Sequence, residues 1–321
     1  MNLNRKWVAV GASALAGLCA AGTAFVSLEW LRRLAVGRKA PKLRVKTETQ
    51  EALQAAREEY AEELDAGVEW LENTPHADIS ITSFDGLKLR GHLYTYPRAK
   101  RTVLMMHGYR SSWKSDFCGA AREIYESGCN LLLAEQRAHG ESEGKTTGFG
   151  VLERYDCAEW LRELTERFGD LPLYADGISM GATTVLMATG LNLPEQVKGV
   201  IADCGFTSPY DIMDRIFTAH SPIPAKLVLP GVSLYNKLKG GYGFSDYSTL
   251  DAMADNQIPV FFAHGDADNF VPMDMTLAAY EACKAPKTLL ITHGVGHGMS
   301  WMVERERYKA MLADFFARCE A

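Results

Sequence analysis

The sequence predicts an α/β fold with a central, mostly parallel sheet of about eight strands, flanked by helices and carrying a helical cap. Short apolar runs alternate with longer helical runs from residue 102 onward, a pattern typical of parallel strands joined by crossover helices. The alternation stops between Thr207 and about Asp251 and then resumes, which indicates an insertion over the sheet. A chain of 321 residues that is 47% hydrophobic and 23% charged is long enough for one such domain.

The first two strands are expected to form a hairpin. Ile79–Phe84 and Leu87–Tyr94 alternate apolar and polar residues on either side of the turn pair Asp85-Gly86, which favours a two-residue loop. The segments that follow are, in order, strand Thr102–Met106, a helix near Cys118–Ser127, strand Asn130–Ala134, helix Leu152–Phe168, strand Leu173–Ala175, helix Met180–Leu191, and the strands Val197–Ala202, Val260–His264 and Thr288–Thr292.

The chain is expected to have three parts. Residues 1–46 form a hydrophobic anchor and a basic linker, residues 47–75 form a helical arm, and residues 76–321 form the α/β domain, with the cap at about 207–251. The arm is rich in Glu, Ala and Leu and ends at Asn73-Thr74-Pro75. It carries no group that suggests chemistry.

The segment from Trp7 to Leu28 carries no charge and, at about 1.5 Å per helical residue, is long enough to cross a ~30 Å hydrocarbon core. We expect it to anchor the chain in the lipid bilayer as a single helix. The alternative is a signal peptide cleaved near Gly22-Thr23-Ala24, which would give a secreted protein. More basic residues follow the segment than precede it, which favours a cytoplasmic location for the domain unless they form a linker without topological meaning. They are Arg5 and Lys6 before it, and Arg32, Arg33, Arg38, Lys39, Lys42, Arg44 and Lys46 after it.

The composition argues against several kinds of partner. The net charge of −6 provides no basic surface for a polyanion, so nucleic acid is not expected as a partner. The seven cysteines are scattered, with no C-x-x-C pair and no Cys/His cluster of zinc-finger spacing, and neither a metal nor an organic cofactor is expected. They are Cys19, Cys118, Cys129, Cys157, Cys204, Cys283 and Cys319.

A pattern that suits a reactive serine occurs twice. Acyl transfer by serine needs a hydroxyl on an exposed turn, and G-x-S-x-G, at Gly140–Gly144 and at Gly177–Gly181, permits such a strained turn. Ser179 follows an apolar strand directly and opens a helical run, whereas Ser142 is flanked by two glutamates that would oppose an oxyanion. The context favours Ser179 as nucleophile. The alternative is that the second pattern is only a well-packed turn.

Two polar, glycine-rich loops follow the last two predicted strands, where an α/β sheet collects its catalytic groups. The first offers Asp266 and Asp268 as an acid, and the second offers His293 and His297 as a base. An acid bonded to one imidazole nitrogen would leave the other nitrogen to take the serine proton. The residues alone do not separate the members of either pair.

The strand Thr102–Met106 ends in His107-Gly108-Tyr109, a tight loop that can present the Tyr109 N–H. Together with the Met180 N–H at the start of a helix, it would form an oxyanion hole. His107 is expected to hold this loop rather than to react. Asp203-Cys204 is expected to be a buried strand end, and Asp176 to be a supporting polar group or a functional carboxylate.

These motifs together resemble the α/β-hydrolase superfamily, and most of all its small bacterial serine-aminopeptidase-like members. The resemblance runs from about Asp78 to Cys319 and rests on HGY at 107, EQRAHGES at 135, GISMG at 177, HGDADNFVP at 264 and GVGHGMS at 294. In that family the acid of H-G-x-x-D-x-x-V-P corresponds to Asp268 and the base to His297. The resemblance therefore implies a triad of these two residues with Ser179. Glu135 departs from the family, in which many members have Asp.

The expected function is hydrolysis of an ester, thioester or amide of a small-molecule acyl substrate through an acyl-enzyme on Ser179. An aminopeptidase-like activity is one alternative, although it would need an acidic site for the substrate amine that the sequence does not locate. A membrane-tethered scaffold on the same fold is another, against which the complete triad argues. The apolar residues of the cap are expected either to line an acyl slot above Ser179 or to bury one another.

Overall fold

The computed structural model describes residues 26–39 and 48–321, with side chains at 26–39 and from Gln54 onward. Its sheet has eight strands in the order β1-β2-β4-β3-β5-β6-β7-β8. β2 pairs antiparallel with β1 and β4, and all other neighbours are parallel, which confirms the predicted fold class. The strands are β1 (Ala77–Thr82), β2 (Lys88–Tyr94), β3 (Arg101–Met106), β4 (Cys129–Ala134), β5 (Leu173–Ile178), β6 (Val197–Asp203), β7 (Val260–Gly265) and β8 (Lys287–Thr292).

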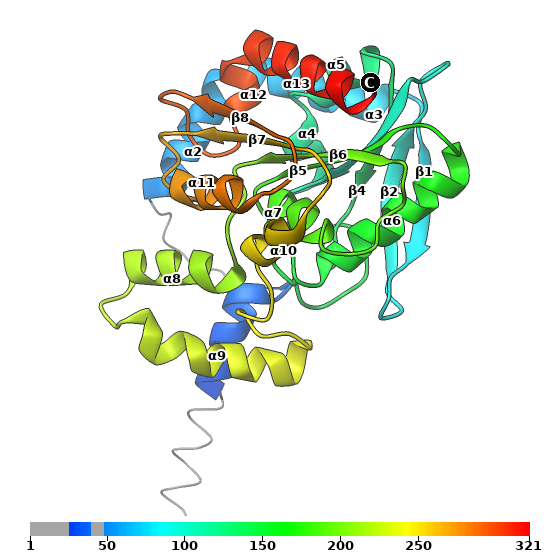
Figure 1. Cartoon of the computed structure of the whole chain (residues 1–321). Coiled ribbons are helices and arrows are strands. Elements are labelled where there is room, and N and C mark those ends of the chain that lie inside the picture. The colour runs from blue at the N-terminus through cyan, green and yellow to red at the C-terminus, as the bar shows by residue number, and fades with distance from the viewer. Residues whose placement is uncertain (1–25, 40–47) are drawn as a thin grey trace, which may run out of the picture.

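Helices cover both faces of this sheet (Figure 1). One face carries α6 (Glu153–Phe168), α7 (Met180–Ala188), α10 (Thr249–Asp255) and α11 (Met273–Ala282). The other carries α3 (Ala61–Asn73), α4 (Trp113–Phe117), α5 (Ala121–Glu126), α12 (Ser300–Val303) and α13 (Arg305–Cys319). The remaining helices are residues 26–36, α2 (Glu48–Glu59), α8 (Pro209–His220) and α9 (Ala225–Gly240).

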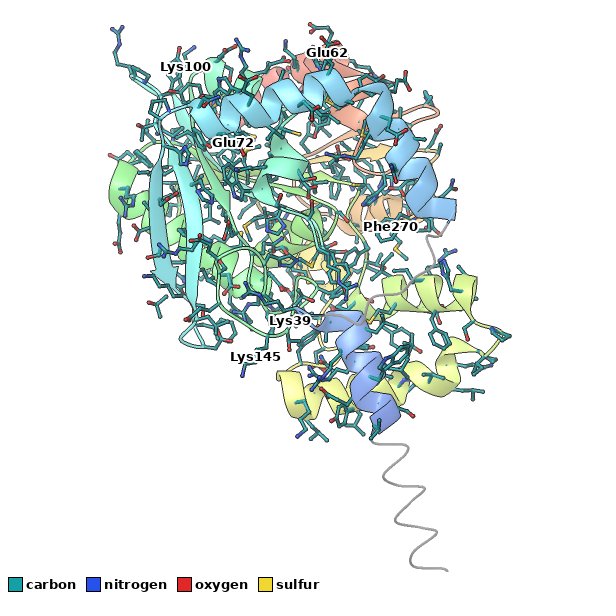
Figure 2. The ribbon with its side chains drawn as sticks, turned by 180° about the vertical axis from the view of Figure 1, so that it is seen from behind. Lys39, Glu62, Glu72, Lys100, Lys145 and Phe270 are labelled. Atoms are coloured by element: carbon teal, nitrogen blue, oxygen red, sulfur yellow. The ribbon has the colours of Figure 1, made fainter. Side chains whose placement is uncertain are left out.

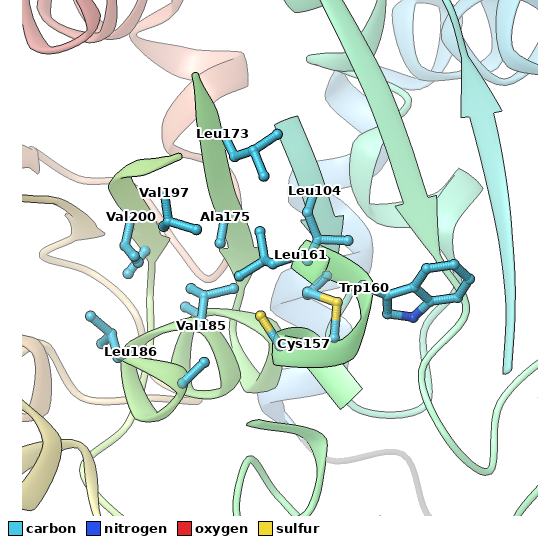
Figure 3. Packing of buried hydrophobic residues seen from close by; sticks show 14 of the residues in the cluster. Leu104, Cys157, Trp160, Leu161, Leu173, Ala175, Val185, Leu186, Val197 and Val200 are labelled. Atoms are coloured by element: carbon cyan, nitrogen blue, oxygen red, sulfur yellow. The ribbon is translucent and has the colours of Figure 1, made fainter. Parts of the chain in front are cut away.

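The central strands are buried on both sides, which explains why they are continuously apolar in sequence. Successive side chains of a strand point to opposite faces. Leu104 of β3 therefore joins the cluster under α6 and α7, where Trp160, Leu161 and Val185 pack (Figure 3). Its neighbour Val103 joins the cluster under α13. β5, the strand that precedes the predicted elbow, is buried in the same way, because Leu173 and Ala175 join the first cluster and Tyr174 joins the second.

The β1–β2 hairpin has a longer loop than the two residues predicted. The last strand pair is Thr82↔Lys88, so residues 83–87 form the connection. Ser83 N–H donates to the Leu87 carbonyl (2.8 Å), and the Ser83 hydroxyl accepts from Leu87 N–H (2.8 Å). Arg137 holds the Asp85 carboxylate at 2.9 Å. These side-chain bonds stabilise a wider turn than the Asp85-Gly86 pair alone would form.

The predicted arm consists of two helices that meet at Tyr60 rather than of one. α3 buries Leu64 and Leu71 in the cluster beneath α13, and the Tyr94 hydroxyl donates to the Leu71 carbonyl (2.6 Å). Arg57 of α2 donates to the Ser115 carbonyl (2.9 Å). The arm therefore packs on the body of the domain.

The insertion after β6 forms α8 and α9, which lie away from the sheet, and helix 26–36 crosses α9 (Figure 1). A third apolar cluster joins this helix to the cap, with Val36, Met213, Leu229 and Phe244 among its buried members. Arg38 donates to the Ser142 carbonyl (2.6 Å). Part of the stretch expected to be anchor and linker is therefore packed against the cap and the domain.

The predicted membrane segment, Trp7–Leu28, lies outside the described residues except for its last three. Leu28 is half-buried against the cap cluster. Across 26–39 and 48–321, none of the helices combines the length and the hydropathy that a membrane crossing requires.

Candidate active site

Ser179 lies at the turn between β5 and α7, with a positive φ of 58° and ψ of −118°. Such a backbone costs a non-glycine residue on the order of 1–3 kcal/mol and persists only where the surroundings impose it. Ser179 N–H donates to the Asp203 carbonyl (2.8 Å). A Cβ at Gly177 would collide with the backbone of Gly181, and one at Gly181 would collide with the Met106 carbonyl. The two glycines thus permit the strand-turn-helix geometry of a nucleophile elbow.

Ser142, in the other G-x-S-x-G pattern, has a fully occupied hydroxyl. It donates to the Glu135 carbonyl (2.6 Å) and accepts from Arg90 N–H (2.8 Å), and its side chain is buried. No helix follows it, because residues 143–148 form an irregular connection. The structure therefore gives this serine a role in holding a loop.

Asp268 and His297 form a direct pair. His297 Nδ1–H donates to Asp268 Oδ2 over 2.6 Å, while Asp268 Oδ1 accepts from the backbone N–H groups of Phe270 (2.8 Å) and Val271 (2.9 Å). His264 Nε2 lies 3.2 Å from Oδ2. Burial raises the pKa of Asp268, but hydrogen bonds from His264 and His297 outweigh it and hold this pKa well below its usual range. The acid is therefore a fixed, charged carboxylate.

His297 presents its second nitrogen toward the end of β6. Burial lowers the pKa of His297, but the Asp268 hydrogen bond and charge outweigh burial and raise this pKa above its ordinary value. Nε2 lies 4.0 Å from Cys204 Sγ. Within the described residues no hydrogen bond joins His297 to Ser179. Catalytic hydrogen bonds are often long before substrate binds, so the missing bond between His297 and Ser179 is compatible with proton transfer between them.

Cys204 is a member of the site that the sequence analysis set aside as a strand end. It has a positive φ of 50° and is fully buried. Burial raises the pKa of its thiol well above the ordinary value, and the Asp203 charge raises it further. The thiol is therefore neutral, and a neutral thiol is a poor nucleophile.

The two residues that rivalled the triad members in sequence form a separate pair. His293 Nδ1–H donates to Asp266 Oδ2 over 2.7 Å, and Gly294 N–H donates to Asp266 Oδ1 over 2.6 Å. The His293 side chain is 77% exposed, whereas that of His297 is 12% exposed. The structure thus joins Asp268 to His297 and Asp266 to His293, and places only the first pair beside Cys204 and the elbow.

The loop after β3 lies against the elbow. A Cβ at Gly108 would stand 3.3 Å from Ser179 Cβ. Gly108 N–H donates to Asp116 Oδ2 (2.6 Å), and Arg110 N–H donates to His139 Nε2 (2.9 Å). Among the described residues, no acceptor takes the Tyr109 N–H that lies between them. The two flanking amides are therefore bonded to protein groups, whereas the Tyr109 amide, which was predicted for the oxyanion hole, is not.

His107 and Asp116 hold this loop through hydrogen bonds. His107 is fully buried, its Nδ1–H donates to the Gly108 carbonyl (2.8 Å), and its Nε2 accepts from Gln136 N–H (3.1 Å). Burial lowers the pKa of His107 to about 3, so the ring is neutral. The Ser111 hydroxyl donates to Asp116 Oδ1 (2.5 Å). His107 thus holds the loop as expected, while the part played by Asp116 was not foreseen.

A small cavity of about 40 Å³ lies behind the elbow, toward α12 and α13. Asp116, Asp176 and Asp203 line it together with apolar side chains. Burial, and then the nearby Asp203 charge, raise the pKa of Asp176 to about 8. Asp176 is therefore largely uncharged near neutral pH.

The side of the site that faces the cap is apolar. Met180, Phe206 and Val271 are buried members of the cap cluster. The Phe270 ring lies 5.1 Å from the His297 ring, and in Figure 2 this residue lies on the part of the domain next to α8. Several apolar residues of the cap are buried against one another and helix 26–36, which is the second of the two arrangements expected for the cap; they are Ile212, Met213, Leu229, Val232, Tyr242 and Phe244.

The sequence of residues 101–227 matches the family model described as the alpha/beta hydrolase fold. Esterase Pf2001 of Pyrococcus furiosus has a similar structure, with a TM-score of 0.62 and 25% identity over 78% of this chain and 94% of that one. The chain has the α/β-hydrolase fold. Its family match and its structural neighbours support membership of the α/β-hydrolase superfamily and an enzyme of the hydrolase class.

Two further proteins are similar to the chain, one in sequence and one in structure. YqkD of Bacillus subtilis, a protein described as uncharacterized, is 28% identical over 238 residues, which are 73% of this chain and 77% of YqkD. An esterase of Exiguobacterium antarcticum, EaEST, is 18% identical with a TM-score of 0.55, covers 76% of this chain and all of its own, and shows the fold alone. The matches do not distinguish the serine-aminopeptidase-like subgroup, which stays a prediction.

Proposed function

We propose that the protein is a serine hydrolase that cleaves carboxylic esters through an acyl-enzyme on Ser179. The observation that carries this proposal is the Asp268–His297 pair, with a 2.6 Å hydrogen bond, a carboxylate held by two backbone amides and a strained serine turn beside it. This arrangement has the parts that acyl transfer needs, namely a nucleophile, a base and a group that orients the base.

In the proposed reaction Ser179 Oγ attacks the substrate carbonyl while His297 Nε2 takes the hydroxyl proton. The N–H groups of Tyr109 and Met180 stabilise the oxyanion that forms. His297 then donates the proton to the leaving alkoxide, and the alcohol departs. Water attacks the acyl-enzyme with His297 again as base, which releases the acid and restores Ser179. Asp268 fixes the His297 tautomer and stabilises the imidazolium in each step.

An ester with an apolar acyl group is the proposed substrate class, because Phe270, Met180 and Val271 line the side of the site toward the cap. The esterase description of Pf2001 agrees with this proposal. A peptidase that binds a free amine would need an accessible carboxylate. Asp176 and Asp203 are buried behind the elbow, and the half-buried Asp116 already accepts from Gly108 N–H and the Ser111 hydroxyl.

The test of the proposed function is covalent labelling by a fluorophosphonate combined with hydrolysis of p-nitrophenyl butyrate. Wild type and Ser142→Ala should be labelled and active, whereas Ser179→Ala should lose both properties. Ser142 is the matched control because it lies in the same sequence pattern but has an occupied hydroxyl. Labelling that survives in Ser179→Ala would refute the assignment.

The segment Trp7–Leu28 is proposed to anchor the hydrolase in a lipid bilayer, with the domain on the cytoplasmic side. The described helix that continues it, 26–36, exposes Val26 and Trp30. The neighbouring α9 exposes Leu227, Leu234 and Leu238, which share one face because they are spaced by seven and four residues. An apolar face beside the entry of an anchor is consistent with a cap that lies against the membrane.

A further inference from the structure

A cluster of metal-ligating side chains lies outside the Ser179 site, where α3 leads into the sheet. Asp78 of β1 pairs directly with His92 of β2 in the antiparallel register, and His76 precedes β1. His92 Nδ1 lies 2.8 Å from Asp78 Oδ1, and His76 Nε2 lies 3.8 Å from the same oxygen. The three side chains can each turn one ligand atom toward a common point, with all of these atoms within 4.8 Å of one another.

The second nitrogen of each histidine is held by an oxygen. His76 Nδ1–H donates to the Thr74 carbonyl (2.9 Å), and His92 Nε2 lies 3.4 Å from Glu135 Oε1. A histidine that ligates a metal almost always gives its other N–H to a carbonyl or a carboxylate, which fixes the ring and its tautomer. Both rings of this cluster have that partner. In the structure His92 Nδ1–H donates to Asp78 Oδ1 (2.8 Å), and a bound ion would take the place of this proton between the two groups.

Aromatic neighbours keep the two rings in place. The His92 ring stacks on Trp113 at 4.0 Å, and the His76 ring lies 4.7 Å from that of Tyr94. The His76 and His92 side chains are 21% and 15% exposed, whereas Asp78 is 66% exposed. The cluster therefore has two nitrogen ligands fixed by packing and one carboxylate open to solvent, through which an ion can enter.

We propose that His76, Asp78 and His92 form a binding site for a divalent transition-metal ion of the zinc class. Two imidazoles and a carboxylate suit zinc, which takes bonds of about 2.0–2.2 Å and keeps a fourth position for water in sites with three protein ligands. A tetrahedral site with such bonds separates its ligand atoms by about 3.4 Å. Two of the three observed separations, 2.8 and 3.8 Å, bracket that value, and the third is within 4.8 Å, so side-chain rotation has to draw the ligands together around the ion.

The bound ion would tie together three parts of the fold. Its ligands come from the segment after α3 and from the β1–β2 hairpin, and Glu135 behind His92 begins the loop that reaches Ser142. Glu135 Oε2 also accepts from Glu141 N–H (2.5 Å). Metal binding should therefore stabilise the folded chain at this edge of the sheet. Glu135 is the position where the sequence departs from the resemblance, and the longer side chain reaches His92.

The proposal is tested by Zn²⁺ titration of the full chain in wild type, Asp78→Asn and Asp266→Asn, with Co²⁺ absorption as a second probe. Asp266 is the matched control, because its carboxylate also accepts from a histidine Nδ1–H but belongs to no three-residue metal cluster within the described part of the chain. Wild type and Asp266→Asn should bind one Zn²⁺ with equal affinity, and Asp78→Asn should bind at least about tenfold more weakly. Because Asp78 is exposed, its Asn variant should keep the fold, and circular dichroism checks this point.

Two readouts locate the ion. Co²⁺ at His76, Asp78 and His92 gives d–d bands without a thiolate charge-transfer band, whereas Co²⁺ at the second metal-sized cluster, Cys204, Asp268 and His297, would give one. The midpoint of thermal unfolding should rise with Zn²⁺ in wild type and in Asp266→Asn but not in Asp78→Asn. Equal Zn²⁺ affinity in wild type and Asp78→Asn, a thiolate band, or no binding at micromolar Zn²⁺ would each overturn the proposal.

Discussion

Replacing Asp268 by Asn should reduce kcat by about 10²- to 10⁴-fold. Both carboxylate oxygens of Asp268 accept hydrogen bonds, Oδ1 from Phe270 and Val271 N–H and Oδ2 from His297 Nδ1–H. The introduced amide has only one oxygen that can accept. If the amide oxygen keeps the backbone bonds, its NH₂ faces Nδ1 and forces the His297 proton onto Nε2, where the ring cannot act as base.

The opposite orientation of the amide preserves the His297 tautomer but leaves two buried N–H groups facing an NH₂ group. Each unsatisfied donor costs about 1–3 kcal/mol, so this orientation costs about 2–6 kcal/mol. At about 1.4 kcal/mol per tenfold, that penalty corresponds to the expected range of rates. The amide orientation that keeps His297 active is therefore rarely populated.

The assay is steady-state hydrolysis of p-nitrophenyl butyrate by Asp268→Asn and Asp266→Asn side by side. Asp266 offers the same chemistry, a histidine and a backbone amide bonded to one carboxylate, at an exposed pair away from the elbow. Asp266→Asn should lose less than about tenfold in kcat, as expected of a group that is not part of the catalytic unit. Equal losses in the two variants, or an Asp268→Asn enzyme within about tenfold of wild type, would refute the reasoning.

Three further predictions follow from the site and the cap. His297 must be neutral to accept the Ser179 proton, so activity should fall as the pH falls through its raised pKa, and the acid limb of kcat/KM should have its midpoint above about 6.5; a midpoint well below that value would contradict the Asp268 effect. Full-length protein should fractionate with membranes at high salt, and a chain starting at Val26 should be soluble and active. A chain starting at Lys46 lacks Val36, a buried member of the cap cluster, and should therefore unfold at a lower temperature. A native N-terminus at Phe25 would show signal cleavage instead. Because each buried methylene contributes up to about 0.8 kcal/mol, kcat/KM should rise several-fold from p-nitrophenyl acetate to hexanoate, and faster turnover of aminoacyl nitroanilides than of every ester would favour the peptidase.

The fold could be predicted because its signal is local. Strands buried on both faces must be apolar throughout, and the helices between them are long enough to show their own pattern, so the alternation from Thr102 to Thr292 identified an α/β sheet. The order of strands in the sheet could not be predicted in this way, since pairing depends on contacts between distant segments. The turns were harder still. The loop at 83–87 is wider than predicted because the Ser83 side chain bonds its backbone, a choice that two turn residues do not reveal.

In the candidate site, too, some residues could be predicted from local sequence and others could not. Ser179 could be singled out from Ser142 because the elbow is a strand, a turn and a helix that follow one another in the chain, so the sequence carries its geometry. The acid and base could not be separated from Asp266 and His293 by the residues alone, because both pairs lie on the same two loops and both form hydrogen-bonded pairs in the folded chain.

The supporting residues lay beyond the sequence for a different reason. Asp116, Cys204 and the cluster of His76, Asp78 and His92 owe their positions to parts of the chain that meet only after folding. Asp116 reaches back eight residues to Gly108, and Cys204 meets His297 across 93 residues. No short motif joins Asp116 to Gly108 or Cys204 to His297. His76, Asp78 and His92 lie closer together, with 14 residues from Asp78 to His92, but their pattern is not one of the Cys/His spacings that identify a metal site. A search for short motifs therefore finds the serine of the elbow. It misses both the groups that surround this serine and the proposed metal site, which is assembled from a hairpin and the segment before it.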